Sequence, residues 1–291
     1  TTSNQYYFRH YSENLEIPEL KWKNILIIDF EDEFARIQAH MLRKAWAKVT
    51  RKMWYEIDAI EKDIDICVLG PGPGNINMEL KSGMSDHEKN EYAKMQKAVA
   101  FAKLCLDNDI PTMGVCMGCQ AIGKAIDNNS VQLQQEPTQW RAMLVDLINL
   151  NEPDLEGRWA ILGFYNSWVV RLTSQLRRKV FATLNKFGDG IVSAVAKDGT
   201  FVMLQGHPDA FEAGWYQGAH LRRGWTLGGF EIQTDYLVYL AVQNKDTIDR
   251  GRDEDISIAD YLKTNGSVKR KKSKRKSSWS RASKVAANGV V

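Results

Sequence analysis

Residues 114 to 123, GVCMGCQAIG, carry two cysteines at a spacing that could serve three kinds of chemistry. Cys116 could be the nucleophile of an enzyme, it could form a redox pair with Cys119, or the two thiols could hold a metal ion. Because no second Cys-x-x-Cys occurs in the chain, a zinc site of the four-cysteine type is not expected. The flanking glycines favour the nucleophile, although a redox-responsive thiol stays open.

The spacing Gly-x-Cys-x-Gly, between an apolar run and a helix, is typical of a nucleophile elbow. Gly114 and Gly118 leave room for a tight turn that lifts the side chain of Cys116 above the carboxyl edge of a sheet. At a helix N-terminus the thiol also faces the positive end of the helix dipole, which favours the thiolate. The backbone N–H of Met117 is then placed to meet the oxyanion that forms when the thiolate attacks a carbonyl.

The elbow needs a base, and the sequence LQGHPDA supplies a candidate. His207 follows an apolar run, and Asp209 comes two residues later. Residues i and i+2 of an extended chain point to the same side, so the carboxylate can hold the imidazole in the tautomer that accepts a thiol proton. Cys116, His207 and Asp209 are therefore our candidate catalytic triad.

A second glycine cluster, GPGPGN, closes another apolar run at residues 70 to 75. It lacks the Lys-Ser/Thr of a phosphate-binding P-loop and the spacing of a dinucleotide fingerprint. Its two prolines make it stiff, which suits a loop that holds one N–H in a fixed direction. We assign that N–H to Gly72, and keep a simple strand-ending turn as the alternative.

The elements around these motifs alternate between strand and helix. Apolar runs predict strands at 25–30, 49–54, 64–70 and 110–116, and helices at 31–46, 91–107 and from 120, with Phe34 on the apolar face of the first helix. Shorter strand-like runs follow at 141–148, 159–172, 191–199 and 200–209, and a last helix at 233–242. The fold class is therefore α/β, a doubly wound and mostly parallel central sheet flanked by helices. The polar residues 77–90, around His87, are expected to form a solvated loop.

Composition and charge set the organisation of the chain. It has 291 residues, 44% of them hydrophobic, and no apolar run long enough to cross a membrane. We expect an N-terminal extension at 1–23, one domain at 24–246, and a polar linker with a basic tail at 247–291, broken by one helical turn at 258–263. Nine Lys or Arg and no acids lie from Lys269 onward. Such a tail could contact nucleic acid or another anionic partner, and it could also be only a solubilising segment.

Cysteine usage and the N-terminus indicate the compartment. Four cysteines are too few for a disulfide scaffold in a chain of this size, so a reducing, cytoplasmic location is expected, or a nuclear one in a eukaryote because of the basic tail. Residues 1–20 lack the basic start and apolar core of a secretory signal. The sequence begins without Met, so we expect a processed chain or a piece of a longer polypeptide.

Taken in order, GPGPGN, GVCMGCQAIG and QGHPD resemble the three signatures of class I glutamine amidotransferase domains, over about residues 24 to 244. Within that family the chain is most similar to the amidotransferase half of phenazine-pathway 2-amino-2-deoxyisochorismate synthases, which are relatives of anthranilate synthase component II. The stretches that carry this finer resemblance are IIDFEDEF (27–34) and GFYNSW (163–168). The family resemblance also implies a flavodoxin-like arrangement of the sheet.

The resemblance implies a role for each matching residue. Cys116 would attack the carboxamide of glutamine, His207 would carry the proton to the leaving ammonia, and Asp209 would orient His207. The oxyanion would be bound by Gly72 and Met117, and glutamine would be held by Gln120 and by a strand formed by Tyr165, Asn166 and Ser167. The chain departs from the family at two positions, since Asp209 stands where Glu is usual and Cys119 where His is usual.

The expected function is a glutaminase subunit or domain that delivers ammonia to a synthase partner, one that acts on chorismate. The alternatives are an amidotransferase for a nucleotide-type acceptor and a catalytically dead binding subunit with the same fold. No cofactor or metal is expected in this chain, and a synthase partner could use Mg²⁺.

Overall fold

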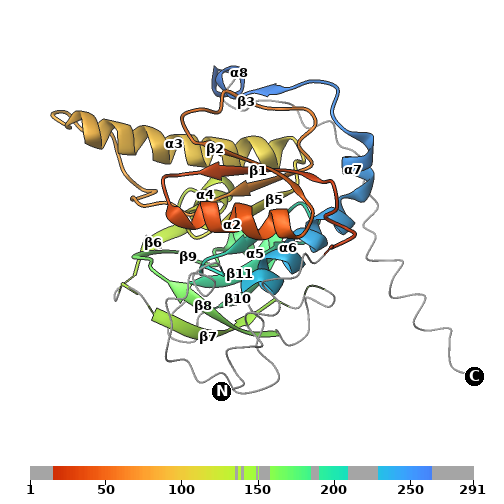
Figure 1. Cartoon of the computed structure of the whole chain (residues 1–291). Helices are drawn as coiled ribbons and strands as arrows, with labels where there is room; N and C mark the ends of the chain where they lie inside the picture. Colours follow the sequence, from red (N-terminus) through yellow and green to blue (C-terminus); the bar gives the residue numbers. More distant parts are fainter. Residues whose placement is uncertain are drawn as a thin grey trace, which may run out of the picture.

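The computed structural model describes residues 16–134, 137–138, 141–148, 150, 158–184, 190–208 and 229–263. Several of our predictions fall outside these residues: Asp209, the basic tail, and the first fifteen residues of the N-terminal extension. The overall arrangement is shown in Figure 1.

A seven-stranded sheet forms the centre of the molecule, in the order β10-β11-β12-β5-β4-β1-β2. Neighbouring strands among β12, β5, β4, β1 and β2 pair in parallel, while β10–β11 and β11–β12 pair antiparallel. The strands are β1 (Asn24–Asp29), β2 (Lys48–Met53), β4 (Ile66–Leu69), β5 (Thr112–Val115), β10 (Val180–Leu184), β11 (Ile191–Ala196) and β12 (Phe201–Leu204). The predicted α/β class with a mostly parallel sheet is confirmed.

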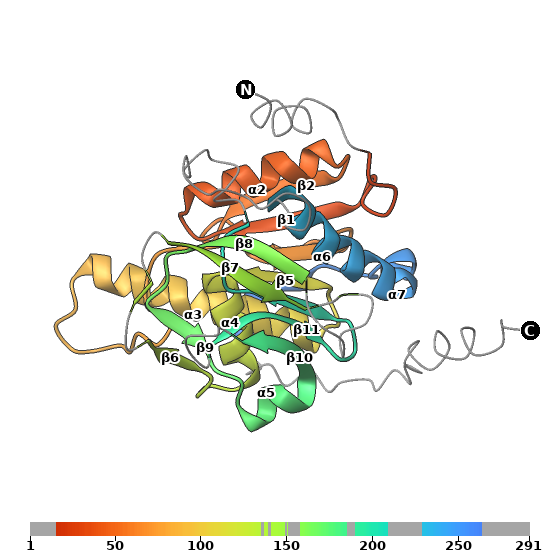
Figure 2. The same ribbon diagram turned by 90° about the horizontal axis from the view of Figure 1, so that it is seen from below.

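Helices cover both faces of this sheet, and each face has its own hydrophobic core. One core contains side chains of α3 (Asp86–Asp107), α4 (Met117–Ile126), α5 (Ser174–Lys179) and α8 (Ile258–Lys263). The other contains side chains of α2 (Glu33–Lys44), α6 (Gly229–Gln243) and α7 (Lys245–Arg250). Figure 2 shows α2 and α6 on one side of the sheet and α3 and α4 on the other. β4 is buried along its whole length because it lies between these two layers.

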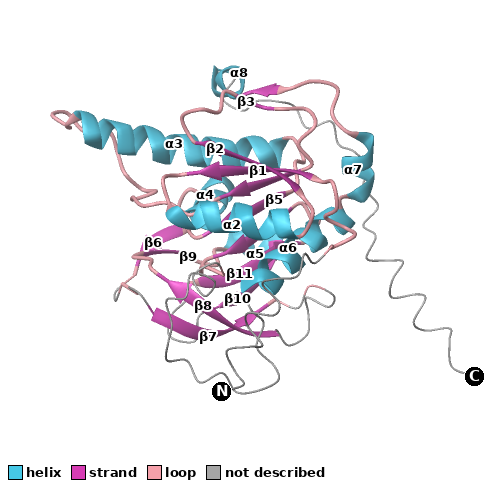
Figure 3. Cartoon of the chain, in the orientation of Figure 1, coloured by secondary structure: helices cyan, strands magenta, loops and turns pink. Residues whose placement is uncertain are grey.

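Three two-stranded pairs complete the described part of the fold (Figure 3). The hairpin of β7 (Arg141–Leu147) and β8 (Arg158–Phe164) packs into the same core as α2 and α6. β6 (Val131–Leu133) pairs with β9 (Trp168–Val170) beside α4, and β13 (Ile256–Ser257) pairs with β3 (Ala59–Ile60). No helix in the described part of the chain is long and apolar enough to cross a bilayer.

The N-terminus of α3 corrects one prediction. We expected a solvated loop up to residue 90, but the helix begins at Asp86 and runs for 22 residues. Ser85 is the N-cap: its hydroxyl accepts a hydrogen bond from the backbone N–H of Glu88, and the Glu88 carboxylate accepts one from the backbone N–H of Ser85. This capping box starts the helix in a polar sequence that has no apolar periodicity. His87 therefore lies exposed on the first turn of a helix.

The segment after residue 246 also differs from the expected linker. The predicted helical turn at 258–263 is α8, and its residues Ile258 and Tyr261 are buried in the core beside α3. The Tyr261 hydroxyl donates a 2.6 Å hydrogen bond to Asp107 at the end of α3. β13 precedes α8 and extends the contact through its pairing with β3. As far as residue 263, this segment is packed against the domain.

Candidate active site

Four adjacent parallel strands, β12, β5, β4 and β1, end at the same edge of the sheet. The residues that follow them are Gln205 to His207 after β12, Cys116 after β5, Gly70 to Gly72 after β4, and Phe30 to Phe34 after β1. The motifs therefore meet at the carboxyl edge, where doubly wound sheets bind their ligands.

Cys116 occupies a strained turn between β5 and α4. Its φ is 51° and its ψ is −105°, outside the regions that L-residues commonly adopt. It takes the N-cap position of α4, and the residue is 8% exposed. The Cys116 N–H donates a 2.8 Å hydrogen bond to the carbonyl oxygen of Leu204, which fixes the turn to the end of β12. This is the geometry expected of a nucleophile elbow.

The two elbow glycines are required by close packing. A methyl group on Gly118 would lie 2.0 Å from the carbonyl oxygen of Leu69, and one on Gly114 would lie 2.6 Å from the carbonyl oxygen of Gly118. The first turn of α4 is therefore in direct contact with the backbone of β4. Any larger residue at position 118 would push the turn away from the sheet.

Gly72 lies beside the elbow. A methyl group there would be 2.6 Å from Cβ of Phe30 and 3.1 Å from Cε of Met117. The structure thus brings together the loop after β4 and the first residue of α4, whose N–H groups are our two oxyanion-hole candidates.

His207 is buried and held by its backbone. Its N–H donates to the Gly163 carbonyl oxygen at 2.8 Å, and its carbonyl oxygen accepts from the Gly163 N–H at 3.3 Å. The imidazole ring packs against two aromatic rings, with centroid distances of 4.9 Å to Phe34 and 4.8 Å to Tyr165. Asp209, the expected orienting carboxylate, lies outside the described residues.

Two of the four expected glutamine-binding residues, Gln120 and Asn166, meet at one carbonyl group. Gln120 Nε2 and Asn166 Nδ2 both donate to the carbonyl oxygen of Trp168, at 3.0 and 3.1 Å. We expected Tyr165, Asn166 and Ser167 to form a strand, but they form the bend that joins β8 to β9. A residue from another segment also holds this bend: the N–H of Gln134, just after β6, donates to the Ser167 carbonyl oxygen at 2.8 Å.

Cys119 packs in a different layer from Cys116. Cys119 is fully buried in the core that contains α3, whereas Cys116 packs in the core on the other face of the sheet. Burial, with the charge of Cys116 as a smaller cause, raises the pKa of the Cys119 thiol well above its ordinary value. Each thiol is free. This arrangement disfavours a redox pair and indicates that Cys119 fills space under α4.

The described residues contain no group of three or more His, Cys, Asp or Glu placed to share a metal ion.

The sequence did not reveal the role of Phe34. Helical spacing predicted that Phe34 faces the core, but the residues of α2 that reach the core lie from Ala35 onward. Phe34 is half-buried in the first turn and stacks on Tyr165 at 5.5 Å as well as on His207. Its place at the end of a parallel strand, where the other motifs also fall, was the signal that could have identified it.

A buried cation supports the same loops. Lys94 of α3 is fully buried, and its Nζ donates to Glu31 at 2.9 Å and to Glu91 at 2.7 Å. The hydrogen bond from Lys94 holds the pKa of Glu31 below its usual value. Glu31 lies in the turn after β1, so this ion pair joins α3 to the turn that presents Phe34.

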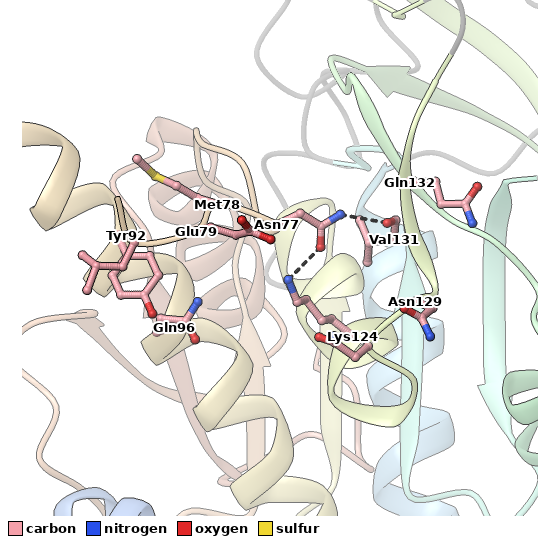
Figure 4. A pocket seen from close by; sticks show the side chains of 11 residues that line it. Asn77, Met78, Glu79, Tyr92, Gln96, Lys124, Asn129, Val131 and Gln132 are labelled. Carbon is pink, nitrogen blue, oxygen red and sulfur yellow. Dashed lines mark hydrogen bonds between the residues drawn. The ribbon is translucent and has the colours of Figure 1, made fainter. Parts of the chain in front are cut away.

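A polar cavity lies apart from the elbow. It measures about 570 Å³ and opens between α3, α4 and β6; none of our predicted site residues lines it (Figure 4). Lys124 Nζ donates to the Ile76 carbonyl oxygen and to Asn77 Oδ1 at 2.8 and 2.7 Å, and Asn77 Nδ2 donates to the Val131 carbonyl oxygen at 2.8 Å. Burial lowers the pKa of Lys124. These contacts brace the loop that continues from Gly72.

The fold and the site together define a doubly wound α/β domain with a cysteine elbow at the carboxyl edge of its sheet. Residues 26–214 match the family model described as glutamine amidotransferase class-I, and the chain belongs to this family. None of the curated proteins compared with the chain gives a significant match.

One solved structure with a TM-score above 0.5 supports the fold, and two others show a weaker similarity to the chain. A candidate GMP synthase component from Thermoplasma acidophilum is 15% identical with a TM-score of 0.52, and the match covers 78% of this chain and 97% of that one. A glutamine amidotransferase of Thermotoga maritima is 14% identical, with a TM-score of 0.49 over 75% of this chain and 96% of that one. PurLQS from Thermotoga maritima is 13% identical, with a TM-score of 0.47, and the match covers 77% of this chain and 99% of that one.

Proposed function

We propose that this chain is a glutaminase that hydrolyses the side-chain amide of glutamine through a thioester on Cys116. The observation that carries the proposal is the elbow itself, where Cys116 is held at a φ of 51° between β5 and the N-terminus of α4. Strained backbone of this kind clusters at functional sites. Membership of the class I glutamine amidotransferase family supports the same reaction.

In the proposed reaction the Cys116 thiolate attacks the amide carbon of glutamine and forms a carbon–sulfur bond. The backbone N–H groups of Met117 and Gly72 stabilise the oxyanion of the tetrahedral intermediate. When the intermediate collapses, the carbon–nitrogen bond breaks and His207 gives a proton to the leaving ammonia. His207 then takes a proton from water, which attacks the thioester and releases glutamate.

The other assignments follow from the resemblance. Asp209 orients His207, while Gln120 and the bend of Tyr165, Asn166 and Ser167 hold the amino-acid end of glutamine. The shared contact of Gln120 and Asn166 with the Trp168 carbonyl oxygen supports this, because it preorganises two amide side chains in one place.

We further propose that the ammonia passes to a synthase partner that uses chorismate, with a nucleotide-type acceptor as the alternative. The chorismate assignment is supported by the stretches IIDFEDEF and GFYNSW. The proposed glutaminase reaction uses water and side-chain and backbone groups of this chain, so a Mg²⁺ requirement would belong to the synthase. Four free cysteines suit a reducing, cytoplasmic location.

The test of glutaminase activity is glutamate release from glutamine by the full chain, alone and with its partner. Cys116→Ala should lower the rate by about 10⁴-fold or more, since removing the nucleophile of a triad enzyme leaves only residual catalysis. Cys119→Ala is the matched control and should stay within a few-fold of wild type. A glutamine analogue with an electrophilic side chain should label Cys116 alone among the four cysteines. Equal activity of Cys116→Ala and wild type would refute the proposal.

The acceptor is tested by purification from the native source and identification of the synthase that accompanies the chain. A chorismate-using enzyme would support our assignment, and a nucleotide-modifying enzyme would replace it with the alternative.

A further inference from the structure

One side chain in contact with the nucleophile has no role in the proposed reaction. Gln205 is the first residue of the QGHPD motif and lies directly after β12, opposite the end of β5. Its side-chain Nε2 donates to Cys116 Sγ over 3.8 Å. Gln205 is 1% exposed, and its backbone N–H donates to the Val192 carbonyl oxygen at 2.9 Å. The amide is thus fixed beside the sulfur.

The other end of the same amide lacks a partner. Gln205 Oε1 is buried and accepts no hydrogen bond from any residue that the structure describes. A buried acceptor that is left unsatisfied destabilises the folded protein, so such atoms call for an explanation. Oε1 and Nε2 are bonded to the same carbon, so the amide group that contacts Cys116 Sγ also carries an unsatisfied acceptor.

We propose that Gln205 is a catalytic residue with two simultaneous contacts; this inference rests on the proposed glutaminase function. Nε2 donates a hydrogen bond to the Cys116 thiolate, and Oε1 accepts a hydrogen bond from the amide nitrogen of the substrate. A carboxamide suits both tasks because it carries a donor and an acceptor in one rigid plane. The orphaned Oε1 is then satisfied only when glutamine is bound.

The proposed hydrogen bond between Gln205 Oε1 and the substrate amide nitrogen would orient the leaving group. When the sulfur–carbon bond forms, the substrate nitrogen becomes the leaving group and must turn its lone pair toward the proton on His207. A hydrogen bond from one of its N–H groups to Oε1 fixes that rotation. Gln205 gains and loses no proton, and the proton balance between Cys116, His207 and ammonia is unchanged.

The donor contact is tested by alkylation of Cys116 with iodoacetamide, followed by peptide mapping. Gln205→Met keeps the length of the side chain but removes both polar atoms. Loss of a hydrogen bond to a charged group should slow alkylation at pH 7 about fivefold or more. Gln38→Met is the matched control, because Gln38 is a fully buried glutamine of α2 whose side-chain amide makes no hydrogen bond to Cys116 or to any other described residue. An unchanged alkylation rate in folded Gln205→Met would overturn the donor role.

The acceptor contact is tested by comparing glutamine with glutamate γ-methyl ester, whose leaving group carries no N–H. Gln205→Met should lower kcat/KM for glutamine about tenfold more than for the ester, the loss expected for one missing hydrogen bond. Gln205→Glu retains an acceptor oxygen in either protonation state and should keep the wild-type ratio of the two substrates. A wild-type ratio in Gln205→Met would overturn the acceptor role.

Failure of this inference is separable from failure of the proposed function. Alkylation of Cys116 needs no glutaminase activity, so it reports on Gln205 even if glutamine is not the substrate. Thermal unfolding of each variant identifies any that do not fold, and Gln205→Glu preserves the volume of the site if Gln205→Met does not fold. An inactive wild type would refute the proposed function and the acceptor role, but not the contact with sulfur.

Discussion

The packing of Gly118 against β4 gives a prediction that tests the elbow directly. In Gly118→Ala the new methyl group would lie 2.0 Å from the carbonyl oxygen of Leu69, while ordinary contacts begin at 3.4 Å. The carbonyl oxygen belongs to a buried strand in the middle of the sheet and cannot move aside. The first turn of α4 must therefore shift by about 1.4 Å.

Such a shift moves the thiol of Cys116 and the N–H of Met117 together. Misplacing reacting groups by about 1 Å costs about 10²-fold in rate, so we expect kcat/KM for glutamine to fall by about this factor. Overpacking of a core costs about 1–3 kcal/mol of folding free energy. In a domain of this size each kcal/mol lowers the Tm by about 2–4 °C, so the variant should still fold at 25 °C.

The assay combines steady-state glutaminase kinetics with thermal unfolding. Gly123→Ala is the matched control on the same helix: its methyl group would meet Cγ1 of the Val170 side chain at 2.7 Å, away from the elbow. It should lower the Tm but leave kcat/KM within about threefold of wild type. If Gly118→Ala were as active as Gly123→Ala, the close contact would not position the nucleophile.

Three further perturbations test other parts of the site. Phe34→Ala should lower kcat/KM about tenfold with little change in Tm, because the His207 imidazole loses a packed ring while Phe34 itself is only half-buried. Unchanged kinetics would show that Phe34 has no role in the reaction. Peptide mapping after mild oxidation should show Cys116 modified without a bond to Cys119, and a disulfide between them would contradict the separate cores. The pKa of Glu31 is lower in the folded protein than its ordinary value of 4.5. The ion pair between Glu31 and Lys94 therefore stabilises the fold at pH values above 4.5, and this stabilisation is lost as the pH falls through the lowered pKa of the folded state. The stability difference between wild type and Lys94→Met, measured by urea unfolding, should therefore be larger at pH 7 than at pH 3, and an equal difference would refute the linkage.

Much of the sheet and of the position of Cys116 could be predicted from local sequence. The apolar runs around Ile25, Ile66 and Thr112 form β1, β4 and β5 because each is long enough to span a buried sheet and ends in charge, glycine or proline. The elbow could be predicted from the glycines around Cys116. Glycine is required at these positions because a side chain would collide with residues a few positions away or with one neighbouring strand.

Features that depend on distant contacts were missed. The segment after residue 246 is polar except for a few residues such as Ile258, and its fold depends on β3 and α3, which lie about 150 or more residues earlier in the chain. Phe34 has the spacing of a core residue in α2, and only the position of His207 across the sheet edge shows that it faces the site. Helical periodicity alone does not separate these two environments.

The packing of the last described segment determines how this domain can be attached to something else. Arg252 donates to the Glu61 carbonyl oxygen, Asp255 accepts from the Lys62 N–H, and both contacts precede β4, at the amino edge of the sheet. Residues 16–23 enter β1 at that same edge, where the Asn24 N–H donates to Asp65. The chain therefore enters the described domain at residue 16 and leaves it at residue 263 on the edge of the sheet opposite Cys116. An affinity tag, a surface anchor or a fused domain joined at either point would start from that edge. Immobilisation through either junction should orient the domain with Cys116 toward the solution.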